Sequence, residues 1–120
     1  MASILAVDDS ASMRQMVAFT LKGAGYDVEE ACDGSEALGI AKNKKFDLVL
    51  SDVNMPVMDG IELVSELRKL SEYKFVPVLM LTTESAGDKK MAGKKAGATG
   101  WTVKHFNPEQ LLNTIKKVLG

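Results

Sequence analysis

The 120-residue sequence is poor in residues that cross-link chains or bind transition metals, with one cysteine, Cys32, and one histidine, His105. A single cysteine cannot form an internal disulfide or a thiolate zinc site, and a single histidine excludes a multi-histidine metal site. We therefore predict that Cys32 is a small residue in or near a core strand. His105 is predicted to fill a loop, with a pH sensor as the alternative.

The sequence also lacks an excess of charge of one sign, because 15 basic and 16 acidic residues leave a net charge of -1. A protein whose main partner is a nucleic acid or an anionic membrane should show a clear basic excess. The apolar run at residues 1–7 is far shorter than the roughly 20 residues of a membrane span, and it lacks the basic region of a signal peptide. We therefore expect a cytoplasmic protein that binds neither nucleic acid nor membrane.

What is present is the composition of a soluble globular protein, with 46% hydrophobic and 26% charged residues. These values are ordinary for that class and exclude disordered and fibrous chains. A chain of this length fits one domain with its own core. We expect a single domain over residues 1–120, with no tail, linker or second domain.

Short apolar runs alternate along the chain with longer amphipathic stretches. The runs predict five strands, and the stretches predict five helices, the last one opening at Asn107 as N-cap and Pro108 in the first turn. The strands are continuous apolar runs, which is typical of a parallel sheet covered by helices on both faces. We therefore predict a doubly wound α/β fold. The predicted strands are 3–7, 28–31, 47–51, 76–81 and 101–103, and the first four helices are 12–24, 34–42, 61–70 and 88–96.

Polar residues stand just past the end of four predicted strands. Asp8 and Asp9 follow the first, Asp52 the third, Thr82 the fourth and Lys104 the fifth. In open parallel sheets, ligands bind at the carboxyl ends of the strands. Neighbouring strands lie about 4.8 Å apart, so three carboxylates would be crowded together if the first and third strands are adjacent. Two carboxylates at 4 Å repel by roughly 4 kcal/mol at an effective dielectric constant near 20, and a bound cation relieves this repulsion.

This set of side chains suits phosphoryl transfer to a carboxylate. Asp52 is the natural nucleophile at the end of a central strand, and a carboxylate nucleophile forms an acyl phosphate. Asp8 and Asp9 are the natural ligands of Mg²⁺, which takes one or two carboxylates and keeps several waters. Lys104 would neutralise charge on the transferred group, and Thr82 would donate from its hydroxyl.

Each of these residues also has a purely structural explanation. Asp9 or Ser10 could cap the following helix, and Asp52 could be a turn residue. Thr82 could reflect strand propensity or capping, and Lys104 alone would read as a solvated surface charge. Chance is a poor explanation for all four strand ends carrying these chemistries together.

Four motifs make the chain similar to a known family: Val7–Ser10, Ser51–Gly60, Leu81–Glu84 and Gly97–Lys104. Over its whole length the chain resembles the bacterial response-regulator receiver domains, and among them the stand-alone chemotaxis regulators. The resemblance implies a flavodoxin-like sheet with strand order 2-1-3-4-5 and five helices. It also implies a monomeric signalling protein whose chemistry is limited to its own phosphorylation and dephosphorylation.

The resemblance further implies a role for each site residue. Asp52 accepts a phosphoryl group from a phosphohistidine on a histidine kinase. Mg²⁺ is held by Asp8, Asp9, Asp52 and the backbone carbonyl of Asn54. Thr82 and Lys104 bind the phosphoryl oxygens.

The same resemblance implies how the signal is read. Trp101 occupies the position of a switch aromatic that turns inward behind Thr82. Asn54 and Glu84 tune the lifetime of the phosphoryl group, although Glu84 alone could be a favourable acid at a helix start. The surface of the fourth helix, fifth strand and fifth helix then binds an output protein, which is the flagellar motor switch for a chemotaxis regulator. A phosphatase is a further possible partner.

His105 departs from the family pattern, which has a proline in cis after the lysine. A cis bond costs about 0.5–1 kcal/mol before proline but about 2.5–4 kcal/mol before other residues. We therefore predict a trans bond between Lys104 and His105. Such a bond would redirect Lys104 and could leave a receiver that responds weakly to phosphorylation.

Two other classes of protein share parts of this pattern. Aspartyl-phosphate hydrolases of the haloacid dehalogenase type need a second aspartate two residues after the nucleophile, where this chain has Asn54, which cannot titrate. Flavodoxin-like binding proteins cradle a phosphate with hydroxyls and glycines in their first loop, where Asp8 and Asp9 would repel one.

Overall fold

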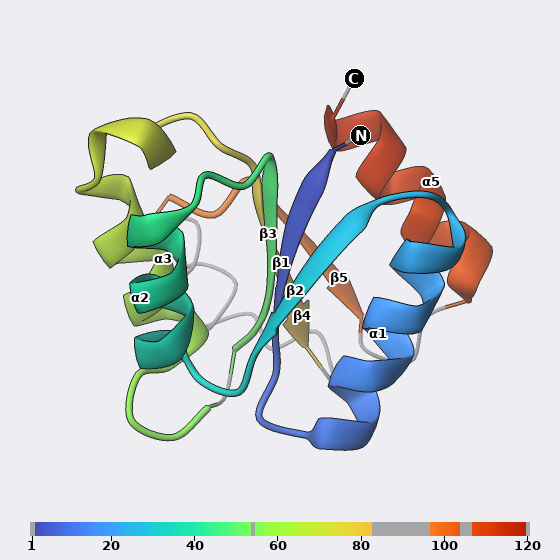
Figure 1. Ribbon diagram of the computed structural model, residues 1–120, viewed down its shortest axis with the longest axis horizontal. Coiled ribbons are helices and arrows are strands. Elements are labelled where there is room, and N and C mark those ends of the chain that lie inside the picture. Colours follow the sequence, from blue (N-terminus) through green and yellow to red (C-terminus); the bar gives the residue numbers. More distant parts are fainter. Residues whose placement is uncertain (1, 54, 83–96, 104–106, 120) are drawn as a thin grey trace.

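The computed structural model describes residues 2–53, 55–82, 97–103 and 107–119. Strands alternate with helices along these residues (Figure 1). The strands are β1 (Ser3–Val7), β2 (Asp27–Ala31), β3 (Leu48–Asp52), β4 (Val78–Thr82) and β5 (Gly100–Val103). The α-helices of the described residues are α1 (Ala11–Gly23), α2 (Gly34–Asn43), α3 (Gly60–Arg68) and α5 (Pro108–Leu119), and a 3-10 helix, η1, covers Ser71–Tyr73.

The five strands form one parallel sheet in the order β2-β1-β3-β4-β5. The fold class and the strand order predicted from the sequence are therefore confirmed. Only four of the five predicted α-helices are found among the described residues, because the helix expected at 88–96 lies outside them. None of the helices that the structure describes has the length and apolar character that a membrane span requires.

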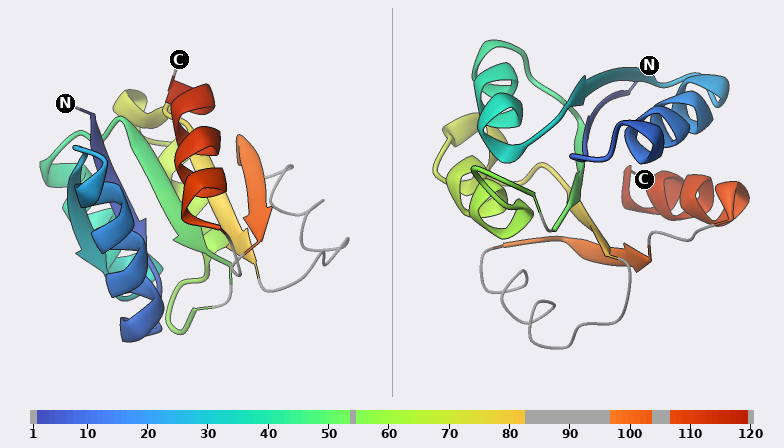
Figure 2. Two further views of the ribbon diagram at one scale, coloured as in Figure 1. Left: turned by 90° about the vertical axis from the view of Figure 1, so that its right-hand side faces the viewer. Right: turned by 90° about the horizontal axis from the view of Figure 1, so that it is seen from below.

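The sheet lies between two layers of helices, with α2 and α3 on one face and α1 and α5 on the other (Figures 1 and 2). Successive strand side chains point to opposite faces, and both faces are apolar. Leu5 and Val7 of β1 belong to the α2/α3 core, whereas Ile4 and Ala6 belong to the α1/α5 core. Burial on both faces explains why the strands are continuous apolar runs in the sequence.

Short polar side chains begin the helices. Ser10 caps α1 by accepting from the Met13 amide at 3.4 Å, and Asp33 caps α2 by accepting from the Glu36 amide at 2.8 Å. Asn107 accepts from the Glu109 amide at 2.8 Å, as predicted for the start of α5. These caps satisfy amide groups that have no partner inside their own helix.

Two apolar residues that stand next to buried positions, Cys32 and Met16, are exposed. Cys32 directly follows β2 but is exposed, because the chain has already left the sheet and turned toward α2. On α1, Met16 is 47% exposed, whereas Val17, Ala18 and Leu21 are buried.

Candidate functional site

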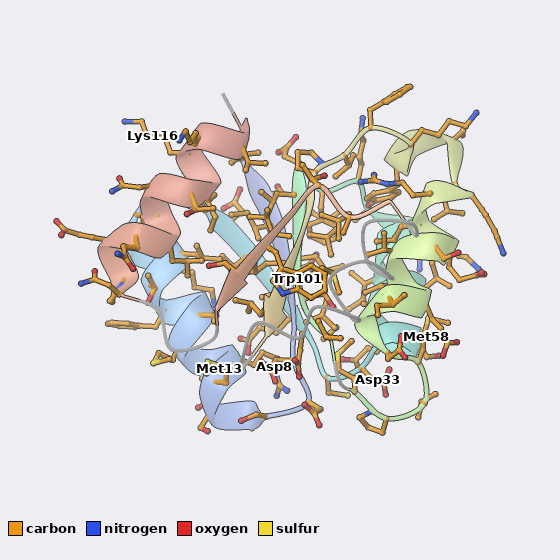
Figure 3. The ribbon with its side chains drawn as sticks, turned by 180° about the vertical axis from the view of Figure 1, so that it is seen from behind. Asp8, Met13, Asp33, Met58, Trp101 and Lys116 are labelled. Atoms are coloured by element: carbon orange, nitrogen blue, oxygen red, sulfur yellow. The ribbon has the colours of Figure 1, made fainter. Side chains whose placement is uncertain are left out.

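The carboxyl ends of β1 and β3 bring the predicted acidic residues to one place. The two strands are adjacent and parallel, and Val7 is level with Ser51. Asp8, just past the end of β1, and Asp52, the last residue of β3, are each one residue further along and therefore lie side by side. Figure 3 shows Asp8 at the end of the sheet where Asp33 and Met58 also lie, far from Lys116 near the end of α5.

Asp8, Asp9 and Asp52 form a compact carboxylate cluster. Each can offer one oxygen such that all three oxygens lie within 4.8 Å of one another. Asp8 is 2% exposed and Asp52 is 4% exposed, whereas Asp9 faces solvent. Two of the three charges are thus largely removed from water, which makes their mutual repulsion strong unless a cation offsets it.

Asp8 is held in place by its neighbours on both sides. Its Oδ1 accepts from the Ser10 amide at 2.9 Å, and its own amide donates to the Ala31 carbonyl at 3.1 Å. Arg14 of α1 donates from Nη1 to the Asp8 carbonyl at 2.8 Å and pairs through Nε with Glu30 Oε1 at 3.2 Å. Because Ser10 is the N-cap of α1, Asp8 and Asp9 are not needed to cap that helix.

The chain after Asp52 turns back closely over the end of β3. The Gly60 amide donates to the Val53 carbonyl at 2.9 Å, and a Cβ at Gly60 would lie 2.1 Å from the Asp52 carbonyl oxygen. Asp59 then caps α3 by accepting from the Glu62 amide at 2.8 Å. The turn at Asp59 and Gly60 therefore packs directly against the backbone of Asp52 and Val53.

The cluster fits a hard divalent cation. Its donors are all carboxylate oxygens, which Mg²⁺ prefers, and the exposed Asp9 leaves one side of the cluster open to waters that Mg²⁺ retains. Nitrogen and sulfur ligands, which would indicate zinc or copper, do not occur in this group of described residues. The predicted residues Asp8, Asp9 and Asp52 are therefore brought together in an arrangement suited to Mg²⁺.

Two further predicted residues lie in described strands. Thr82 is the last residue of β4, with its backbone level with Val103 of β5. Trp101 of β5 is half-buried against the α2/α3 core, and its indole Nε1 is buried without a hydrogen-bond partner among the described residues (Figure 3). Asn54, Glu84, Lys104 and His105 lie outside the described residues, and so does the predicted trans bond between Lys104 and His105.

Sequence reasoning missed two arginines that organise the fold, Arg14 beside the site and Arg68 at the opposite end of the sheet. Arg14 supports the backbone of Asp8, and Arg68 at the end of α3 donates to carbonyls of several segments. An arginine on a helix is usually read as a solvated charge, and neither residue lies in a recognisable motif. One signal for Arg14 was present in the sequence. Arg14 lies about one helical turn after the Ser10 cap, a spacing that places it near the start of α1 and close to Asp8.

The comparisons with known proteins agree with this geometry. The profile of the response regulator receiver domain matches residues 4–116. The chemotaxis protein CheY homolog of Campylobacter jejuni is 39% identical over 119 residues, which cover 98% of this chain and 92% of that protein. The probable transcriptional regulator ycf27 of Porphyridium aerugineum is 42% identical over 116 residues, and the chain spans 47% of its length.

Solved structures give the same result. The chemotaxis response regulator CheY4 of Vibrio cholerae is similar with a TM-score of 0.94 and 60% identity, over 98% of each chain. The receiver domain of the sensor histidine kinase PA1611 of Pseudomonas aeruginosa is similar with a TM-score of 0.93 and 26% identity, over 99% of this chain and 98% of that one. That structure has a magnesium ion coordinated in its active-site cleft.

Proposed function

The chain belongs to the response regulator receiver family, and from this premise we propose that it is a phosphorylation-operated switch with Asp52 as phosphoacceptor. The observation that carries the proposal is the cluster of Asp8, Asp9 and Asp52 oxygens within 4.8 Å at the ends of β1 and β3. We propose that residues 1–120 act as one receiver domain.

The proposed reaction is transfer of a phosphoryl group from a phosphohistidine to Asp52. A carboxylate oxygen of Asp52 forms a bond to phosphorus, the N–P bond breaks, and its electron pair returns to the imidazole of the donor. Asp8, Asp9, Asp52 and the Asn54 carbonyl would hold Mg²⁺, which when bound neutralises charge on the transferring oxygens. Lys104 and Thr82 are proposed to bind those oxygens.

The positions of the acidic residues support this division of roles. Asp52 ends the central strand and is fixed from behind by the close approach of Gly60. Asp8 is oriented by the Ser10 amide and by Arg14, so it does not need to reorganise before a cation binds. Such preorganisation is the main contribution that a protein makes to phosphoryl transfer.

Signal duration and readout follow in the same proposal. Asn54 and Glu84 tune hydrolysis of the acyl phosphate, and Asn54 cannot serve as the titrating acid of a phosphatase. Thr82 and Trp101 communicate the phosphorylated state to the surface of the fourth helix, β5 and α5. By analogy with the chemotaxis relatives, the phosphodonor is a histidine kinase and the output partner is the flagellar motor switch.

A phosphorylation experiment tests the proposal. Wild type and Asp52→Ala are incubated with acetyl phosphate with and without Mg²⁺, the covalent phosphoryl group is measured by intact mass, and Trp101 fluorescence is followed. Trp101 is the single tryptophan of the chain, so its signal is unambiguous. We expect Mg²⁺-dependent mass gain and a fluorescence change in wild type, and neither in Asp52→Ala.

Two outcomes would count against the proposal. An unmodified wild type, or equal modification of Asp52→Ala, would exclude Asp52 as the acceptor. Rapid multiple turnover of small phosphoesters would favour the hydrolase alternative instead. A parallel His105→Pro variant shows whether the departure from the family pattern weakens the response, because it restores the residue whose cis form costs least.

A further inference from the structure

The Arg68 side chain forms a clamp at the end of the sheet opposite the carboxylates. Its Nε and Nη2 donate to the Gly97 carbonyl at 3.0 and 2.8 Å, and its Nη1 donates to the carbonyls of Tyr73 and Val76 at 2.7 and 2.6 Å. Nη2 also makes a longer contact of 3.4 Å with Thr99 Oγ1. One side chain therefore joins the end of α3 to η1, to the chain before β4 and to the chain before β5.

The fork shape of arginine is needed for this arrangement. One edge of the guanidinium donates to the Gly97 carbonyl, and the nitrogen on the opposite side donates to the carbonyls of Tyr73 and Val76. A single ammonium group cannot reach both sides in this way. The partners found in the described part of the chain are neutral oxygens, and burial lowers the pKa of Arg68 below its ordinary value. The charge is thus used to hold backbone segments rather than to bind an anion.

The backbone conformation of Gly97 and its lack of a side chain allow Arg68 to approach closely. Its φ of 111° is open to glycine and strained for other residues. A Cβ at Gly97 would lie 3.0 Å from Arg68 Cγ and 3.1 Å from Nε, which is tighter than an ordinary contact. A side chain at position 97 would therefore disturb both the backbone and the clamp.

Two hydrogen bonds between the chain segments leading into β4 and β5 reinforce the clamp. The Thr99 amide donates to the Val78 carbonyl at 2.8 Å, and the Val78 amide donates to Thr99 Oγ1 at 3.0 Å. Trp101 follows two residues later in a strand of only four residues. The amino end of β5 is therefore fixed to α3 and β4, whereas its carboxyl end adjoins the proposed phosphoryl site.

We propose that Arg68 is a positioning residue that holds the start of β5 in a fixed place. Phosphorylation at the carboxyl end of the sheet can then move only the later part of β5, and this movement changes the surroundings of Trp101. This inference rests on the proposed function, because it concerns how phosphorylation of Asp52 is read. Without the clamp, β5 can shift as a whole, and the phosphorylated and free states become less distinct at Trp101.

The experiment compares Arg68→Met, Arg68→Lys and a control, Val17→Ala, which removes buried volume from α1 on the other face of the sheet. Phosphorylation is measured by intact mass with saturating Mg²⁺ and acetyl phosphate, at a temperature where all variants are folded. The readout is the Trp101 fluorescence change per phosphoryl group. We expect Arg68→Met to lose at least about threefold in this ratio while its phosphorylation stays within about twofold of wild type.

The variants separate positioning from general stability. Val17→Ala should keep the wild-type ratio even if its melting temperature falls as far as that of Arg68→Met. Arg68→Lys should resemble Arg68→Met, because charge without the fork does not restore the clamp. A wild-type ratio in Arg68→Met, an equal loss in Val17→Ala, or a loss of phosphorylation itself would overturn the proposal.

Amide exchange tests the clamp without a phosphodonor. In Arg68→Met we expect faster exchange at the Thr99 and Val78 amides, and unchanged exchange at the Asp8 and Val53 amides, which are bonded at the other end of the sheet. Uniformly faster exchange would overturn the proposal that Arg68 holds the start of β5 in place. An unphosphorylated wild type would overturn the proposed function instead, and the exchange pattern would then decide the clamp alone. If Arg68→Met does not fold, Gly97→Ala removes the clamp from its other side.

Discussion

The hydroxyl of Tyr73 connects two distant parts of the chain at the level of a single residue. It accepts from the Phe46 amide at 3.1 Å and donates to the Lys44 carbonyl at 2.6 Å. Tyr73 itself is 1% exposed, and its bond with the Phe46 amide is buried, whereas the bond to the Lys44 carbonyl is partly buried. They fasten η1 to the segment that leads into β3, and their loss would leave buried polar groups unpaired.

Tyr73 makes stability depend on alkaline pH. Burial raises the pKa of Tyr73 above its ordinary value near 10. The stability contributed by the neutral hydroxyl is therefore fully present below the unfolded-state pKa and is lost as pH rises through the higher folded-state pKa. We expect the free energy of urea unfolding to fall more steeply above about pH 10 in wild type than in Tyr73→Phe.

Tyr73→Phe should already have a lower free energy of unfolding at neutral pH, by about 1–3 kcal/mol, because it leaves the Phe46 amide and the Lys44 carbonyl without their Tyr73 hydrogen bonds. Tyr26→Phe is the matched control, since Tyr26 belongs to the rim of the α1/α5 core. Identical alkaline slopes in wild type and Tyr73→Phe would show that ionisation of Tyr73 is not the cause.

At the level of secondary-structure elements, the start of α3 depends on the absence of a side chain at Gly60. A Cβ there would lie 2.1 Å from the Asp52 carbonyl oxygen and 2.6 Å from Met80 Cε. The nearer contact is backbone, so it cannot be relieved by a rotamer change. We expect Gly60→Ala to lower the unfolding free energy by about 3 kcal/mol or more and to weaken Mg²⁺ binding, as measured by urea titration and calorimetry.

Gly39→Ala is the control for this substitution. Gly39 lies inside α2 with no atom within 4 Å of an added Cβ, so alanine should stabilise the helix by about 0.5–1 kcal/mol. Destabilisation of similar size in both variants would contradict the steric explanation.

The elements also show what could be predicted from the sequence. Apolar runs and caps predicted the strands, the helices of the described residues and the acidic site, because these depend on local spacing and on strand ends. The roles of Arg14 and Arg68 could not be predicted, because they depend on carbonyls brought together only by the folded chain. The exposure of Cys32 could not be predicted either. Cys32 lies one position past the end of β2, where the chain leaves the sheet, and its side chain is therefore exposed although that of Ala31 is buried.

At the scale of the whole molecule, the carboxylate cluster couples stability to divalent cations. Three oxygens within 4.8 Å repel in the absence of a cation, and a ligand that binds only the folded state stabilises it by about 2.7 kcal/mol at 100 times its Kd. We expect Mg²⁺ to raise the melting temperature of wild type relative to EDTA. Asp9→Asn should melt a few degrees higher in EDTA, roughly 1 kcal/mol, and gain less from Mg²⁺.

Asp27→Asn is the control for charge alone. Asp27 is exposed at the start of β2, level with Ser3 and therefore at the far end of the sheet from the cluster. Its substitution should leave the Mg²⁺ effect unchanged. If the melting temperature of wild type is the same with Mg²⁺ and with EDTA, the cluster does not bind the cation in solution.

The placement of the chain ends has a practical consequence. The start of β1 and the end of α5 both lie at the end of the sheet opposite Asp8 (Figures 1 and 3). A fluorescent protein, an affinity handle or a surface tether can therefore be fused at either terminus without shielding the carboxylates. Such a fusion would make the domain usable as a sensor that is attached at the end of the sheet opposite Asp8, with the carboxylate cluster facing the solution.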